Sequence, residues 1–226
     1  MDTTALTQSL AFDELNNYAK QQAIAQYGQP PDDWHEEIYA RAMGDGPERG
    51  FNINEIQFSG FHSQGDGASW TGYIDLATFL AYHNKPDAAD YAQYVVLAEL
   101  IKDGWCEGHL VISRNGYYYN HSGTMRSDGI DDRIHYAEDD SVVDRGILEG
   151  ANVRELAKSI GTDELFNELD NWTLHKAQKY ADEIYKQLKE EYEAYTSEEY
   201  FIDLCDINGW RFDNHGTLIE GDHHGI

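Results

Sequence analysis

The sequence has few cysteines, no long apolar run and no basic leader. Its two cysteines, Cys106 and Cys205, stand about a hundred positions apart in a chain of 226 residues. A chain of this length does not need a disulfide to fold, so we expect buried free thiols in a cytoplasmic protein. No apolar run approaches the roughly 18 residues of a membrane span. The start, MDTTALTQSLAFDEL, lacks the basic segment and apolar block of a secretory signal.

Basic residues are also scarce. The chain has 16 Lys and Arg against 42 Asp and Glu, a net charge of −26. Such a chain is repelled by free nucleic acid and by anionic lipid surfaces, so we expect it to bind neither and to favour a basic partner. Three interpretations of the charge stay open. It can serve solubility or adaptation to a salty interior, it can bind a basic protein, or it can imitate the phosphates of a duplex in a nucleic-acid-binding cleft.

The rest of the composition supports a folded core. Hydrophobic residues make up 41% of the chain and include 16 Tyr, eight Phe and five Trp, so wholesale disorder is not expected. We expect one α+β domain over residues 1–226. A small, mostly antiparallel sheet with central hairpins is packed by N-terminal helices and by a long C-terminal helix. The tail, residues 221–226, is expected to fray.

Local signals place the individual elements. Helical spacing and capping residues predict helices after Asp13, after Asp32 or Asp33, from Asp163 to about Tyr195, and after Thr196. Alternating apolar and polar residues predict strands at 52–61 and 68–75, joined by the loop 62–67. The pair Asn115–Gly116, which is preferred in type I′ turns, predicts a tight hairpin between 108–114 and 117–123. A last hairpin is expected to turn at Asn214–Gly216.

The stretch QFSGFHSQGDGASWTG combines glycines, hydroxyl residues and aromatics. It does not read as a phosphate loop, because it leads into a strand rather than a helix and no Lys or Arg is close by. The structural interpretation is a tight turn, in which Gly65 and Gly67 supply positive φ and Asp66 caps the turn. The alternative is a recognition loop, since its polar side chains are flanked by aromatics.

Under the recognition interpretation, this loop and the strand around 117–121 form a pocket for a small nucleotide-like or sugar-like molecule, with aromatic rings available for stacking. The candidate binding residues are His62, Ser63, Gln64, Asp66, Ser69, Trp70, Tyr117, Tyr119 and His121.

Catalysis and metal binding are less favoured. Ser69 with His62 offers a nucleophile and a base, but the stretch is not the G-x-S-x-G elbow of hydrolases. Cys106, His109 and His121 offer zinc ligands, but their spacing matches no standard zinc pattern. We therefore expect no catalytic residue, no bound metal and no cofactor.

The polar region that follows is strongly acidic. The stretch DDRIHYAEDDSVVD holds six acids among 14 residues, and it is interpreted either as a solvated loop or as the centre of a mimetic surface. The acidic residues assigned to this surface are Asp128, Asp131, Asp132, Glu138, Asp139, Asp140 and Asp144.

The block QFSGFHSQGDGASWTG resembles a motif of uncharacterised bacteriophage and prophage proteins, some of which carry antitoxin-like labels. The helices FDELNNYAKQQAIAQYG and WHEEIYARA precede it in the expected order, and the close KEEYEAYTSEEYFIDLCDINGWRFDNHGTLIE is also similar, so the resemblance covers most of the chain. It implies a viral or mobile-element protein acting in a bacterial cytoplasm. It implies no activity, cofactor or catalytic residue.

Together these observations predict a phage-type protein without catalytic activity. It binds and inhibits a basic host protein or complex that handles nucleic acid or defends the cell, and its acidic surface competes with nucleic acid. The alternative is the small-ligand binding module described above. A hydrolase at His62 and Ser69 ranks last. The oligomeric state is left open.

Overall fold

The computed structural model describes residues 9–83, 94–95, 97–98, 101, 108–116, 119–129 and 162–220, with backbone only for 162–166. They belong to two compact units. The smaller unit is Met1–Glu37 with Gln187–Ile226, and the larger unit is Ile38–Lys186. The expectation of one domain stays a prediction, and the frayed tail at 221–226 lies outside the described residues. No described helix has the length and apolar character that a bilayer span requires.

The larger unit contains an antiparallel sheet. Its strands β1 (Phe51–Ser59), β2 (Gly67–Asp75), β3 (His109–Arg114) and β4 (Met125–Ser127) lie side by side in chain order. The predicted hairpin of β1 and β2 is confirmed, with Ser59 opposite Gly67 at the loop end and a bulge between Ile53 and Glu55. The predicted α+β class is therefore confirmed.

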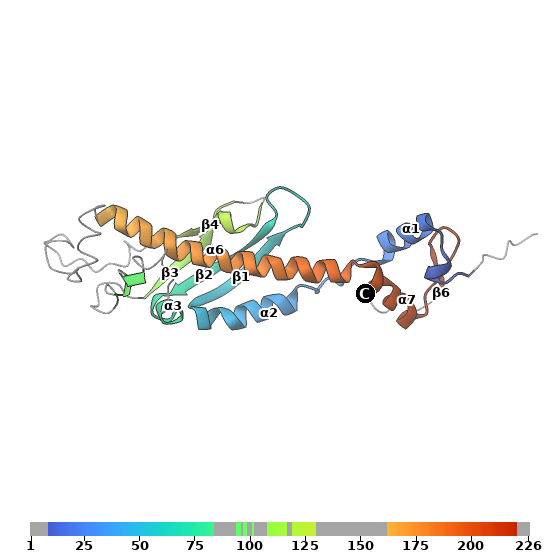
Figure 1. Cartoon of the computed structure of the whole chain (residues 1–226), viewed down its shortest axis with the longest axis horizontal. Coiled ribbons are helices and arrows are strands. Elements are labelled where there is room, and N and C mark those ends of the chain that lie inside the picture. Colours follow the sequence, from blue (N-terminus) through green and yellow to red (C-terminus); the bar gives the residue numbers. More distant parts are fainter. Residues whose placement is uncertain are drawn as a thin grey trace, which may run out of the picture. The chain divides into compact units, whose positions relative to one another are not determined.

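Three helices accompany this sheet: α2 (Glu36–Asp45), α3 (Leu76–Tyr82) and α6 (Thr162–Tyr195). Helix α3 begins where β2 ends, because the Asp75 side chain accepts a hydrogen bond from the Thr78 backbone N–H at 2.8 Å. Figure 1 shows the long helix α6 running along the sheet. The predicted helix from Asp163 to about Tyr195 is confirmed, and α6 buries Leu169, Thr173, Ala177, Tyr180, Ile184 and Leu188 at helical spacing. Within the larger unit, Tyr180 stacks on Phe51 of β1 at 5.3 Å between ring centroids.

The tight hairpin predicted at Asn115–Gly116 is wrong. Arg114 pairs with Met125, so residues 115–124 connect β3 to β4, and the last three of them form the short 3-10 helix η3 (Ser122–Thr124). The Asn115 N–H donates to the Thr124 carbonyl at 2.8 Å, which closes this wider loop. The tertiary contacts that residues 119–121 make with the β1–β2 loop replace the local turn preference.

The smaller unit contains α1 (Asn17–Tyr27), α7 (Glu198–Asn208) and the two-stranded sheet of β5 (Arg211–Phe212) and β6 (Leu218–Glu220). The predicted terminal hairpin is thus confirmed. The core of the smaller unit is a cluster of buried aromatic, aliphatic and thiol side chains, formed by Phe12, Leu15, Ala19, Ala23, Phe201, Cys205, Trp210 and Phe212.

Two predicted caps in this unit are off by one to three residues. Asn16, rather than Asp13, caps α1 by accepting from the Ala19 N–H at 3.0 Å. Asp13 instead lies in the short 3-10 helix η1 (Phe12–Glu14). Ser197, rather than Thr196, caps α7 by accepting a hydrogen bond from the backbone of the third residue after it.

Candidate functional site

The loop between β1 and β2 is organised by Asp66. Its carboxylate accepts hydrogen bonds from the backbone N–H groups of His62, at 2.7 Å, and Ser63, at 2.5 Å. The Asp66 N–H donates in turn to the Ser63 carbonyl at 3.2 Å. Gly65 has a φ of +98°, as predicted, whereas Gly67 does not have positive φ. The predicted capping of the turn by Asp66 is confirmed.

The structure brings the loop beside residues 119–121. A side chain at Gly65 would touch the Tyr119 ring at 2.9 Å, and one at Gly67 would touch the His121 Cβ at 2.5 Å. The Asn120 backbone N–H donates to the Ser59 hydroxyl at 3.1 Å. The two halves of the predicted pocket are therefore neighbours. Tyr117 lies outside the described residues.

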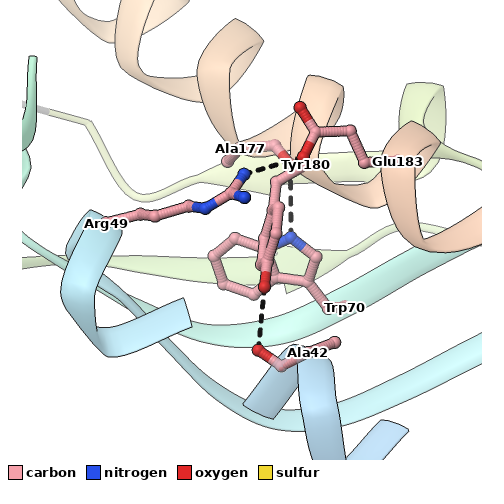
Figure 2. A network of polar contacts seen from close by, with 6 residues as sticks. All are labelled: Ala42, Arg49, Trp70, Ala177, Tyr180 and Glu183. Carbon is pink, nitrogen blue, oxygen red and sulfur yellow. Dashed lines mark hydrogen bonds and ion pairs between the residues drawn. The ribbon is translucent and has the colours of Figure 1, made fainter. Parts of the chain in front are cut away.

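Two of the candidate residues, Ser69 and Trp70, lie on β2 and are buried. Trp70 is 1% exposed, and its indole N–H donates to the Ala177 carbonyl of α6 at 3.2 Å (Figure 2). Ser69 is also 1% exposed, and its hydroxyl has no hydrogen-bond partner in the described part of the chain. Solvent reaches the exposed side chains of His62, Ser63 and Gln64. The accessible part of the loop is therefore its tip.

Most of the predicted acidic surface lies outside the described residues, namely Asp131, Asp132, Glu138, Asp139, Asp140 and Asp144. Asp128 is described, and its carboxylate accepts from the Val111 N–H at 2.8 Å. This hydrogen bond holds the chain that follows β4 against β3. Of the histidines weighed as zinc ligands, His109 is exposed, and its ring lies tilted against that of Tyr73, with 4.6 Å between ring centroids.

A second cluster, which the sequence did not indicate, centres on Arg49. This residue ends the 3-10 helix η2 (Gly46–Arg49), and Gly50 follows with a φ of +84°. A side chain at Gly50 would approach the Phe79 backbone N at 2.6 Å, so only glycine fits here. The Asp75 N–H donates to the Gly50 carbonyl at 2.8 Å. The end of β2 and the start of α3 thus fix the backbone that carries Arg49.

The Arg49 guanidinium is held between a carboxylate and two rings. It forms an ion pair of 2.7 Å with Glu183 of α6 (Figure 2). It lies 4.6 Å from the centroid of the Tyr180 ring and 5.8 Å from that of Tyr82. The Tyr180 hydroxyl donates to the Ala42 carbonyl of α2 at 2.9 Å, which fixes the ring under the guanidinium.

Electrostatics keep this arginine charged. Partial burial lowers the pKa of Arg49, but the hydrogen bond and the ion pair with Glu183 outweigh this effect, so the pKa is raised. Burial raises the pKa of Tyr180 as well, against the smaller opposite effect of Arg49. The site therefore presents a cation beside the neutral phenol of Tyr180.

A cavity of about 210 Å³ opens at this cluster. It is lined by Arg49, Phe51, Tyr82, His83, Lys176, Lys179, Tyr180 and Glu183. Three cationic side chains therefore face one carboxylate. Sequence reasoning missed the cavity because Arg49 and the two lysines come from segments more than 120 positions apart and share no local pattern.

The smaller unit has its own cavity, of about 340 Å³. It is lined by Ala11, Phe12, Asp13, Ile202, Cys205, Asp206, Gly209, Trp210 and Arg211. Helix α7 exposes two isoleucines on this unit, Ile202 at 39% and Ile207 at 80%. Its acidic residues, Glu198, Glu199, Asp203 and Asp206, are all exposed. Helix α7 is thus an acidic element with apolar side chains among its charges.

Comparison with known proteins gives one match. Residues 34–198 match the model of a family described as "Domain of unknown function (DUF8835)". This range includes the β1–β2 loop and the Arg49 cavity. No curated protein and no solved structure matches the chain.

Proposed function

The chain belongs to this family of unknown function, and we propose that it is a phage-type protein of the bacterial cytoplasm that binds and inhibits a basic host protein. The proposed target is a complex that handles nucleic acid or defends the cell. The acidic surface of the smaller unit occupies the cleft in which that complex holds the phosphates of nucleic acid. The proposal includes no catalytic step.

The observation that carries the proposal is the excess of acidic residues in the smaller unit. Residues 9–37 and 187–220 hold 15 acidic residues and three basic ones. Lys189 and Glu193 of α6 form an ion pair at 3.7 Å. An excess of acidic over basic residues produces a negative field that attracts basic surfaces and accelerates their association.

Helix α7 gives this field a contact surface. Exposed carboxylates on α7 can pair with Lys and Arg of a partner, and Ile202 and Ile207 can bury apolar area in the same contact. Charge sets the rate and specificity of such an association, while the apolar area limits dissociation.

The test is capture from bacterial lysate at low salt, followed by elution at high salt and identification of the eluted proteins. A nucleic-acid-binding complex that is released by salt, and from which the chain displaces a labelled duplex, supports the proposal. Affinity that is equal at low and high salt contradicts charge competition. Retention of no protein contradicts the proposal as a whole.

A charge-reversal variant locates the surface. The triple variant Glu198→Lys, Glu199→Lys and Asp203→Lys should abolish capture, because it reverses the charge of α7. The matched control makes the same number of reversals at exposed acids of the larger unit, with Glu48→Lys, Glu55→Lys and Asp182→Lys. It should keep most of the binding. Equal loss in both variants would mean that net charge alone governs capture.

A second candidate function is a small-ligand binding module for a nucleotide-like or sugar-like molecule. The contact of Gly65 with Tyr119 and of Gly67 with His121 favours it, because both halves of the predicted pocket come together. Asp66→Ala would abolish ligand binding under this candidate. Charge reversal of Glu198, Glu199 and Asp203 would abolish partner binding under the first.

A further inference from the structure

We propose that the Arg49 cavity is a binding site for a small phosphate-bearing anion. The site goes beyond the proposed function, because it belongs to the larger unit and does not depend on the acidic surface. The proposal is based on the charge that lines the cavity, on the fixed geometry of Arg49, and on the size of the space.

Positive charge is concentrated at this cavity. The described residues between 38 and 186 include seven Lys and Arg, which are Arg41, Arg49, Arg114, Arg126, Lys176, Lys179 and Lys186. Three of the seven line this single cavity, with one carboxylate, Glu183, opposite them. Clustered cations produce a local positive potential, which attracts anions to this place although the chain as a whole has a net charge of −26.

The position of Arg49 is fixed before any ligand arrives. Glu183 holds one terminal nitrogen, and Tyr180 and Tyr82 flank the guanidinium. A guanidinium carries five N–H donors in a rigid fork, so one carboxylate does not use all of them. The remaining donors can bind the oxygens of a phosphate with little loss of side-chain entropy.

Lys176 and Lys179 complete the site from α6. They are three positions apart, so they lie on neighbouring turns of one helix face, and both line the cavity. An ammonium group carries three N–H donors and a positive charge, both of which suit an anion. Arg49 from η2 and the two lysines from α6 therefore surround the same space from different elements of the larger unit.

The size of the cavity indicates a small ligand. Its volume of about 210 Å³ is below the roughly 300 Å³ at which pockets for drug-sized ligands begin. A phosphate group, free or on a small ester, has the charge and dimensions for it. The half-exposed ring of Tyr82 borders the same space and can contact the organic part of an ester.

The experiment is calorimetric titration of the full chain with inorganic phosphate and with phenyl phosphate, at constant ionic strength. Both probes should bind, with released heat, at low millimolar concentration or below. Tighter binding of phenyl phosphate assigns the site to a phosphate ester, and equal or tighter binding of inorganic phosphate assigns it to the free anion. Binding of neither probe overturns the proposal.

Two variants locate the binding. Lys179 is exposed and can be changed without loss of folding, so Lys179→Gln is the decisive variant, and it should weaken binding about tenfold. Lys186→Gln removes one charge from the same helix outside the cavity, and it should leave the affinity within about twofold. Equal weakening by both variants would overturn the site, because it would show a response to net charge alone.

Glu183→Gln separates an anion site from a purely structural ion pair. Glutamine keeps an acceptor for Arg49 but removes the competing negative charge. An anion site predicts tighter phosphate binding in this variant. Unchanged or weaker binding in folded protein would contradict it, because it would mean that the carboxylate does not oppose the ligand.

Discussion

The indole N–H of Trp70 donates to the backbone carbonyl of Ala177 at 3.2 Å, across 107 positions of sequence. This bond joins β2, which carries the end of the glycine-rich stretch, to the middle of α6. The Trp70 ring also packs on Phe51 of β1, with 5.7 Å between ring centroids. The tryptophan of the stretch is thus part of the core between the sheet and the long helix.

Trp70→Phe should lower the free energy of unfolding by about 2 kcal/mol, because it removes the hydrogen bond and part of a buried ring. The measurement is urea unfolding followed by circular dichroism. Tyr18→Phe is the control, since Tyr18 is 66% exposed and its change should stay within about 0.5 kcal/mol. Equal midpoints for wild type and Trp70→Phe would show that the bond adds no stability.

Asp66→Ala should open the β1–β2 loop. The backbone N–H groups of His62 and Ser63 would lose their common acceptor, and their hydrogen exchange should accelerate at least about tenfold, with a loss of about 1 kcal/mol in stability. Asp66→Asn keeps an acceptor oxygen, so its effect should be smaller. Unchanged exchange at both amides in Asp66→Ala would refute the capping role.

Helices and the main strand pair could be predicted because their signals are local. The apolar spacing from Leu169 to Leu188 matches the face of α6 that is buried. Caps were less certain, since Thr196 and Ser197 are chemically equivalent neighbours and only the backbone conformation selects between them. A local sequence pattern predicts the type of an element more reliably than it predicts the residue at which the element begins.

Long-range contacts could not be predicted. The pair Asn115–Gly116 indicated a tight turn, but residues 119–121 pack against the β1–β2 loop, and the connection to β4 is longer. The Arg49 cavity shows the same limit, because the charges that meet there are brought together by the pairing of β1 with β2 and the packing of α6. Their proximity is a property of the tertiary fold.

Asp170→Asn should stabilise the protein at neutral pH. Burial raises the pKa of Asp170, although the hydrogen bond donated by the Ser127 hydroxyl opposes the shift and the charge of Asp128 adds to it. The folded state therefore keeps the Asp170 carboxyl protonated to a higher pH than the unfolded state does. The stability linked to the group is present below the ordinary pKa of 3.8 and is lost as pH rises through the raised value.

Asparagine cannot ionise, so Asp170→Asn does not lose this stability. Its gain in the free energy of unfolding over wild type should be below about 1 kcal/mol at pH 7 and should vanish near pH 3, where aspartic acid is also neutral. Urea unfolding at both pH values measures it. Asp182→Asn, at an exposed position of the same helix, is the control and should change stability little at either pH. A variant that is destabilised at pH 7 would show that the Ser127 bond requires the charge.

Cys205 should be an unreactive thiol in the folded protein. It is free and 5% exposed, as expected from the sequence, whereas Cys106 lies outside the described residues. Burial, with a smaller effect of Asp206, raises the pKa of Cys205 to about 12. Because the thiolate is the nucleophile, alkylation by iodoacetamide at pH 8 should be slower than in urea by about a thousandfold.

Mass spectrometry of the peptide that contains Cys205 measures this protection, with the same protein in urea as the reference. The raised pKa of Cys205 also makes the stability of the fold depend on pH. The folded thiol keeps its proton while the unfolded thiol releases it, so stability should fall as pH rises from about 9 towards 12. Cys205→Ala should lose stability at pH 7 through lost packing, but its stability should then depend less on pH over that range. Rapid alkylation of folded protein at pH 8 would instead show that the 340 Å³ cavity lined by this residue admits the reagent and that the thiol ionises there.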